Sequence, residues 1–282
     1  VITATDKLGG RGGKQLLESA VKKYAVSKGI PVLQPKNLKA PEFTAKLRSY
    51  QADLQIIVAF RMLPEVVWNM PPLGTFNLHG SLLPRYRGAA PINWAVIRGE
   101  KQTGVTTFFL QHEIDTGNII MQNVLPIGPN DTAGDVHDRM MVLGAETVLK
   151  TVQLIEANQV ETRCQEDELA TSAPKLKAEN TKIDFHQTSQ DVHNFIRGLS
   201  PYPTAWALLE GKKWKLLKSA PERVTHDYKP GQIVSDAKSY FKVATADGFV
   251  EILELQMPGK RRMPTQDFLN GWRGSEVELG FE

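Results

Sequence analysis

Apolar positions along the first part of the chain follow two spacings, one typical of strands and the other of helices. Leu54 to Phe60 is a continuous, largely β-branched apolar run, as expected of a strand buried on both faces. Helical spacing of apolar residues instead runs from Leu16 to Tyr24 and again through the long segment from Thr132 to Asn158. Thr132 and Asp135 form a plausible capping pair at the start of that long helix.

The same spacing predicts the other elements of this region. Strands are expected at 1–3, 31–33, 75–79, 105–110 and 119–124, and helices at 41–50, 63–70 and 89–98. Alternation of strands and helices favours an α/β fold, in which helices cover both faces of a parallel sheet. We therefore predict one α/β domain over residues 1–165.

The pattern changes after this domain. Residues 166–178 are polar and interrupted by Pro174, so we interpret them as a linker. A helix is expected at 189–199, followed by short strands at 205–209, 214–218, 232–235, 240–245 and 249–255. Short strands separated by Gly or Asp turns are typical of a small barrel, so residues 179–282 are predicted to form a second domain.

Composition narrows the class of protein. Hydrophobic residues make up 41% of the chain and charged residues 23%, as in globular proteins. The longest apolar stretch is strand-sized, and no signal-peptide pattern opens the chain. Cys164 is the only cysteine, which excludes an internal disulfide and favours a reducing compartment. These features predict a cytoplasmic protein.

Charge is unevenly distributed along the chain. Residues 1–50 contain ten Lys or Arg against three Asp or Glu, whereas residues 179–282 contain fourteen of each kind. A basic segment on a nearly neutral chain is consistent with an anionic partner. A solvated helix face would give the same composition, and both interpretations stay open here.

The segment from Phe76 to Pro91 contains the clearest chemical signal. Asn77 and His79 lie two residues apart on a predicted strand, so their side chains project from the same face. They stand at the carboxyl end of that strand, where open α/β sheets bind their ligands. Asp115 follows another predicted strand and supplies a carboxylate.

These three side chains suit acyl-type transfer to an amine. The amide of Asn77 is able to stabilise the oxyanion that forms at the attacked carbonyl. His79 is suited to remove a proton from the attacking amine, and Asp115 to orient the imidazole and favour its charged form. The residues leave open whether His79 acts as a base, as a cationic stabiliser of the oxyanion, or as both in turn.

A longer set of motifs resembles the folate-dependent formyltransferases. It comprises the runs Asn77–Pro84, Arg87–Pro91, Thr103–Thr106 and Asp115–Gly117. The resemblance covers nearly the whole chain and implies a Rossmann-like domain that uses 10-formyltetrahydrofolate as co-substrate. It implies that Asn77, His79 and Asp115 are the catalytic residues. The loop beside the folate is then formed by Ser81, Leu82, Leu83 and Pro84.

Two further features resemble the members of this family that formylate methionyl initiator tRNA. One is the Gly-rich basic loop from Asp6 to Lys14, whose Arg11 and Lys14 would meet the acceptor stem. The other is the C-terminal domain, which resembles an OB-like tRNA-binding barrel. Cations expected to contact tRNA there are Lys213, Lys215, Lys260 and Arg261. For the strand lysines, a charged edge that resists aggregation is an equally good interpretation.

The resemblance implies a monomer that supports translation initiation. Because the histidines lack metal-ligand spacing, no metal is expected. Two alternatives remain, namely an amino-sugar formyltransferase and a catalytically inactive folate- or RNA-binding module. The family pattern also places a strand, a glycine-containing turn and a helix before Val1, and these would complete the sheet and the folate site.

Overall fold

The computed structural model describes residues 1–9, 15–58, 62–272 and 280–281, and its chain divides into two compact units. Unit 1 comprises Val1–Phe76 and unit 2 comprises Asn77–Glu282. The mixed α/β class with a separate antiparallel β domain is as predicted. The domain boundaries predicted from the sequence, 1–165 and 179–282, stay a prediction.

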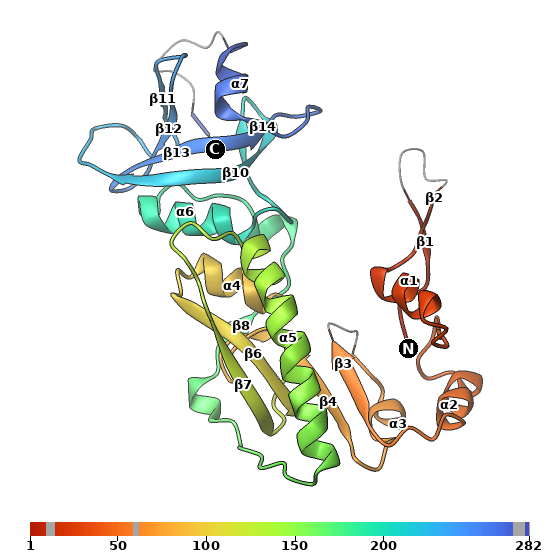
Figure 1. Cartoon of the computed structure of the whole chain (residues 1–282). Helices are drawn as coiled ribbons and strands as arrows, with labels where there is room; N and C mark the ends of the chain where they lie inside the picture. The colour runs from red at the N-terminus through yellow and green to blue at the C-terminus, as the bar shows by residue number, and fades with distance from the viewer. Residues whose placement is uncertain (10–14, 59–61, 273–279, 282) are drawn as a thin grey trace. The chain divides into compact units, whose positions relative to one another are not determined.

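In its described residues, unit 1 contains the paired strands β1 and β2 and three helices (Figure 1). Its elements are β1 (Lys7–Gly9), β2 (Gln15–Leu17), α1 (Ala20–Ser27), α2 (Pro41–Arg48), β3 (Gln55–Val58) and α3 (Glu65–Trp68), followed by the first residues of β4 (Thr75–His79). Its core joins Leu38, Phe43 and Leu47 to Val67 of α3.

The first helix begins later than the spacing of apolar residues predicts. Leu16 and Leu17 belong to β2, which pairs antiparallel with β1. The side chain of Ser19 accepts a hydrogen bond from the backbone N–H of Lys22, so this serine caps α1. The prediction of a helix from Leu16 was therefore wrong, because leucines at helical spacing also fit a short hairpin strand followed by a cap.

Unit 2 contains the rest of β4 and two groups of elements. The first group comprises β5 (Arg87–Gly88), α4 (Pro91–Ile97), β6 (Gln102–Phe109), β7 (Ile119–Pro126), α5 (Ala133–Glu156) and β8 (Ser172–Ala173). In the sheet β6 lies between β4 and β7, and β7 runs antiparallel to β6. Helix α5 packs along β6 and β7 (Figure 1). Its N-terminus has the capping box of Thr132 and Asp135 that the sequence predicts.

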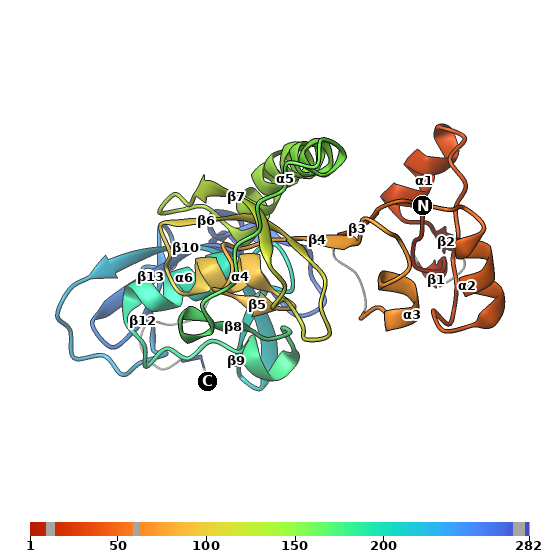
Figure 2. The same cartoon turned by 90° about the horizontal axis from the view of Figure 1, so that it is seen from below.

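The second group forms the antiparallel β domain. Its elements are α6 (Ser189–Gly198), β9 (Ala205–Leu209), β10 (Lys212–Arg223), β11 (Ile233–Ser235), β12 (Phe241–Ala244), β13 (Gly248–Gln256), β14 (Met263–Pro264) and α7 (Thr265–Leu269). The strands are ordered β11-β12-β13-β10-β9, and β14 pairs with β13. Helix α6 lies between α4 on one side and β10 and β13 on the other (Figures 1 and 2). It therefore joins the β domain to the α/β part of unit 2.

Part of the segment 166–178, which the sequence analysis interprets as a linker, pairs with another part of unit 2. Ser172 and Ala173 form β8, which pairs in parallel with β5. The backbone N–H groups of Arg87 and Ala89 donate to the carbonyls of Thr171 and Ala173. This polar segment is thus fixed against the Gly- and Pro-rich loop that follows β4.

Close approach of β6 to β7 depends on a glycine. A Cβ atom added to Gly104 would lie 2.2 Å from the carbonyl oxygen of Asn123, which is far inside van der Waals contact. We expect Gly104→Ala to destabilise the protein by about 1–3 kcal/mol, because backbone atoms must move to admit the methyl group. Urea unfolding measures this difference.

Gly271→Ala is the matched control, since its added methyl group would meet only the Phe268 carbonyl oxygen at 3.9 Å. Equal stability of the two variants would contradict this account of the β6–β7 pairing.

Candidate active site

His79 is the last residue of β4 and is buried, with 6% of its surface exposed. Its Nε2 atom lies 2.8 Å from the backbone carbonyl oxygen of Tyr86. A carbonyl oxygen only accepts hydrogen bonds, so Nε2 carries the proton. The other ring nitrogen, Nδ1, lies 3.8 Å from Oδ2 of Asp115, beyond hydrogen-bond distance but close enough for ion pairing.

The Asp115 carboxylate is held by a backbone group of the loop that follows β4. Its Oδ2 atom accepts a hydrogen bond from the backbone N–H of Gly88 at 2.9 Å. Asp115 adopts a left-handed backbone with φ of 58°, a conformation that is strained for a residue with a side chain. Two residues later, a Cβ on Gly117 would lie 1.7 Å from the carbonyl oxygen of Phe109, so the turn requires glycine there.

Asn77 lies two residues before His79 on β4, and its amide has an unpaired acceptor. Among the residues that the structure describes, its buried Oδ1 atom finds no hydrogen-bond partner. Leaving such an atom unpaired costs about 1–3 kcal/mol. Unpaired polar groups of this kind are expected where a ligand supplies the missing partner.

Two side chains of the loop from Ser81 to Pro84 point inward. The hydroxyl of Ser81 donates to the Arg85 carbonyl at 2.6 Å, and Leu83 packs with Phe108 and Ile119. Leu82 and Pro84 are half-buried and keep accessible surface.

Two polar side chains to which sequence analysis assigned no role fix the backbone of this loop. The Thr106 hydroxyl donates to the carbonyl of Ser81 and accepts from the N–H of Leu83. Nε2 of Gln122 donates to the carbonyl of Leu83. Both residues alternate along predicted strands, so position alone does not distinguish them from ordinary strand residues.

The contacts of His79 and Asp115 also involve residues that sequence analysis did not single out. Tyr86 and Gly88 contribute backbone groups, and both have positive φ, 63° and 124°. A Cβ on Gly88 would lie 2.7 Å from the Ala173 carbonyl oxygen, which explains the glycine. The only available signal was the Arg-Gly pair in a loop next to the Asn-x-His motif.

The candidate tRNA-binding cations of the β domain lie partly together. Lys215 pairs with Gln256 across β10 and β13, and the Gln256 side chain donates to the carbonyl of Lys260. Lys260 and Arg261 are exposed in the segment that follows β13. Lys213 lies two residues before Lys215, with its ammonium 4.2 Å from the centre of the Trp206 ring. Arg11 and Lys14 lie outside the described residues.

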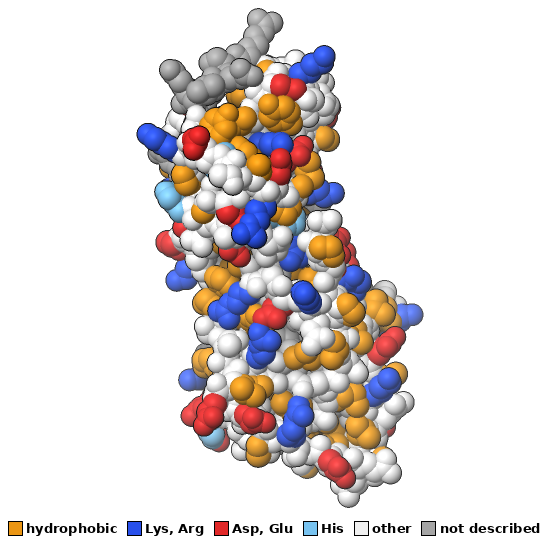
Figure 3. Space-filling view, turned by 90° about the vertical axis from the view of Figure 1, so that its left-hand side faces the viewer, with side chains coloured by type: hydrophobic (Ala, Val, Ile, Leu, Met, Phe, Trp, Pro, Cys, Tyr) orange, Lys and Arg blue, Asp and Glu red, His pale blue; other side chains and the backbone are white. Residues whose placement is uncertain are grey.

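Positive charge does not gather into one patch on the face shown in Figure 3. Lys and Arg side chains are scattered there among acidic and apolar ones.

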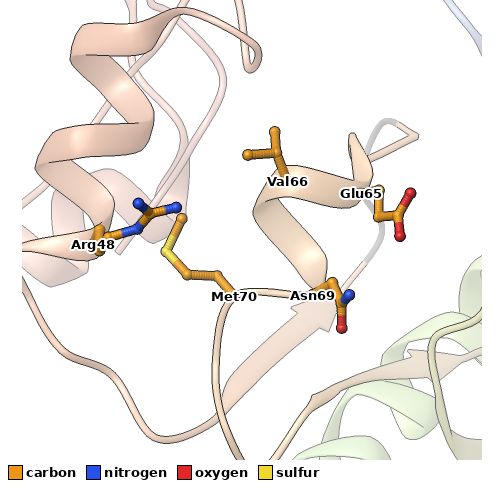
Figure 4. Close-up of a pocket in the computed structure, with 5 residues that line it drawn as sticks. All are labelled: Arg48, Glu65, Val66, Asn69 and Met70. Carbon is orange, nitrogen blue, oxygen red and sulfur yellow. The ribbon is translucent and has the colours of Figure 1, made fainter.

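A separate surface pocket lies in unit 1. It is lined by Arg48, Glu65, Val66, Asn69 and Met70 (Figure 4). None of the residues predicted for catalysis or binding lines it. The candidate active site is thus a set of side chains in unit 2, recognised by its chemistry rather than by this pocket.

The described part of the chain holds neither a cluster of metal-binding side chains nor a membrane-spanning helix. No group of three or more His, Cys, Asp or Glu side chains gathers there in a way that would hold a metal ion. Among the same residues, no helix has the length and apolar character needed to cross a membrane.

Tyr86 provides a test of how its loop is held. Its buried hydroxyl donates to Glu100 at 2.6 Å, and burial together with this bond raises the pKa of Tyr86 from 10.0 to about 12. The protonated tyrosine therefore stabilises the fold below pH 10, and this stabilisation is lost as the pH rises toward 12.

We expect Tyr86→Phe to be about 1 kcal/mol less stable than the wild type near neutral pH, where it lacks the bond to Glu100. The difference should shrink between pH 10 and 12, because only the wild type must ionise the phenol. Urea unfolding across this range measures it, and a constant difference would contradict the buried hydrogen bond.

Comparison with known proteins identifies the family of this chain. Residues 1–152 match the sequence profile of the formyl transferase family, and residues 175–273 match the profile of the formyl transferase C-terminal domain. The methionyl-tRNA formyltransferase of Bacteroides thetaiotaomicron is 52% identical over 98% of this chain and 88% of its own length. That of Flavobacterium johnsoniae is 51% identical over 96% of this chain and 87% of its own length.

Solved structures show the same fold. HypX from Aquifex aeolicus, in complex with tetrahydrofolic acid, matches with a TM-score of 0.63 at 21% identity, over 90% of this chain and 47% of its own. The N-formyltransferase from Helicobacter canadensis, in complex with folinic acid and dTDP-3-aminofucose, matches with a TM-score of 0.64 at 24% identity, over 88% of this chain and 85% of its own. With both profiles and these relatives in agreement, the chain belongs to the formyl transferase family.

Proposed function

We propose that this protein transfers the formyl group of 10-formyltetrahydrofolate to the amino group of methionyl initiator tRNA. The proposal is supported by relatives named methionyl-tRNA formyltransferase that are 51–52% identical over nearly the whole chain. The structural observation that carries it is the buried His79 ring, which lies 3.8 Å from the Asp115 carboxylate and on the same strand face as the unpaired amide oxygen of Asn77.

His79 is proposed to remove the proton that the attacking amine loses. Because Nε2 is committed to the Tyr86 carbonyl, Nδ1 is the ring atom free to take up a proton. Protonation there places the positive charge next to the Asp115 carboxylate, which balances it. The backbone N–H of Gly88 holds that carboxylate in place.

Asn77 is proposed to act on the reacting centre from the same strand face. Its Oδ1 atom is suited to accept a hydrogen bond from the incoming amine, since no donor among the described residues occupies it. The NH₂ group of the same amide is then proposed to donate to the oxyanion that forms at the formyl carbon. One side chain would thus align the nucleophile and stabilise the developing charge.

When bound, 10-formyltetrahydrofolate supplies the activated formyl group. Ser81 to Pro84 are proposed to line its site mainly through the loop backbone and the half-buried Leu82 and Pro84. The inward side chains of Ser81 and Leu83 keep that backbone in place. Holding this backbone in place is proposed to lower the entropic cost of binding the co-substrate.

Substitution of His79 tests the proposed reaction. We expect His79→Ala to lower formyl transfer by roughly 10²- to 10⁴-fold, the range for removal of a general acid–base group. Transfer from 10-formyltetrahydrofolate to methionyl initiator tRNA by the full-length protein is the measurement. The control is His137→Ala, because His137 is an exposed histidine of α5 whose ring lies beside its neighbour Asp138.

If His79→Ala transfers the formyl group as fast as the control, His79 is not a catalytic residue. If the wild type leaves the tRNA unmodified but formylates an amino sugar in a His79-dependent way, the acceptor is wrong and the site is retained. Tetrahydrofolate binding without any transfer would indicate the inactive binding module.

The cations of the β domain are tested separately. We expect the double variant Lys213→Ala and Lys260→Ala to raise KM for the tRNA and leave kcat nearly unchanged, since these residues contact phosphates and not the reacting atoms. Each lost phosphate contact should also flatten the dependence of log affinity on log salt by about 0.7–0.9. The control is Lys150→Ala on the exposed side of α5. An unchanged KM and salt slope would remove these lysines from the interface.

A further inference from the structure

We propose that Gln165 is a positioning residue that sets the distance between His79 and Asp115. This inference rests on the proposed formyl transfer, and it concerns a residue in the segment between α5 and β8. The hydrogen-bond partners of the Gln165 side chain include neither His79 nor the carboxylate of Asp115. It acts instead on the two loops that hold them.

The side-chain amide of Gln165 uses its full hydrogen-bonding capacity. Its Nε2 atom donates to the carbonyl oxygens of Asp115 at 2.9 Å and Gly117 at 2.8 Å. Its Oε1 atom accepts from Nε of Arg87 at 3.1 Å and from Nη2 at 2.8 Å. Arginine only donates and carbonyl oxygens only accept, so the amide has one possible orientation.

These four bonds connect the loop that follows β4 to the turn that carries Asp115. On one side they fix the turn that carries Asp115 in its left-handed conformation. On the other side they fix Arg87, whose neighbours Tyr86 and Gly88 supply the carbonyl for His79 and the N–H for Asp115. A strained turn persists only where surrounding contacts hold it, and Gln165 provides two of these contacts.

The backbone around Gln165 is itself anchored at both ends. Arg163 and Ile119 exchange two backbone hydrogen bonds, which fixes the segment to the start of β7. Ser172 and Ala173 pair with β5 on the other side. Gln165 is therefore presented to both loops from a fixed backbone.

Gln165→Glu is the sharpest variant because it keeps the shape of the side chain. A carboxylate still accepts from Arg87, but it places negative charge against the carbonyl oxygens of Asp115 and Gly117. We expect kcat for formyl transfer to fall by roughly 10- to 100-fold, since small displacements of catalytic groups have effects of this size. KM for the tRNA should change little, because Gln165 is not among the residues proposed to contact the tRNA.

The matched control is Asp167→Asn. Asp167 is exposed and accepts from Arg87 at 2.7 Å without touching the Asp115 turn. Its variant should keep nearly wild-type kcat. An equal loss in both variants would overturn the inference, because it would place the effect in Arg87 rather than in the link to Asp115.

A double-mutant cycle separates positioning from a general loss of stability. If Gln165 acts through Asp115, Gln165→Glu should have little further effect in the Asp115→Asn background. The same fold-loss in both backgrounds, or no loss in the wild-type background, would overturn the proposal. Circular dichroism and cooperative thermal unfolding establish that each variant is folded.

Failure of the proposed function is distinguishable from failure of this inference. If the wild type does not formylate the tRNA, the proposed acceptor is wrong. The same cycle is then measured on His79-dependent release of formate from 10-formyltetrahydrofolate. A kcat loss in Gln165→Glu that vanishes in the Asp115→Asn background supports the inference there, and any other result rejects it.

Discussion

The hydrogen bond from Nε2 of His79 to the Tyr86 carbonyl is the interaction on which the rest of the site depends. A carbonyl oxygen cannot donate, so this single contact decides which ring nitrogen carries a proton. It leaves Nδ1 facing Asp115, where a second proton produces an imidazolium beside a carboxylate. The chemistry assigned to the strand residues therefore depends on a backbone group of the following loop.

That loop directs two backbone groups, the Tyr86 carbonyl and the Gly88 N–H, toward His79 and Asp115. Tyr86 and Gly88 both have positive φ, and Asp115 on the opposite loop has the same handedness. Such conformations cost of order 1–3 kcal/mol each at residues other than glycine. The cost is offset by bonds from the polar segment after α5, including Thr171 to the N–H of Tyr86 and Gln165 to the carbonyl of Asp115. Strain and the contacts that hold it are thus concentrated around one pair of side chains.

The sequence contained much of the fold and the side chains of the site, because both leave periodic signals. Apolar spacing located β4, β6, β7 and α5, and the two-residue spacing of Asn77 and His79 correctly placed them on one strand. It did not show that β7 is antiparallel to β6, since strand direction depends on long-range pairing. Leu16 and Leu17 fit either a helix or a hairpin, and the cap at Ser19 decided between them.

What sequence analysis missed has a common physical origin. Tyr86 and Gly88 act through backbone atoms, which residue types do not reveal. Gln165 is the last residue of the predicted α/β domain, directly before the polar segment 166–178, and no motif marks it. Its role depends on the approach of two loops that are 28 residues apart in sequence (Arg87 to Asp115). Contacts of this kind arise only from the folded arrangement.

The protonation of the His79 ring is the property that tests this account most directly. Nuclear magnetic resonance of protein with ¹⁵N-labelled histidine rings distinguishes the two neutral tautomers, and the His79→Ala variant assigns the signal. The account predicts that the neutral ring carries its proton at Nε2. A neutral ring protonated at Nδ1 with a bare Nε2 would contradict it, because the Tyr86 carbonyl would then have no proton to accept.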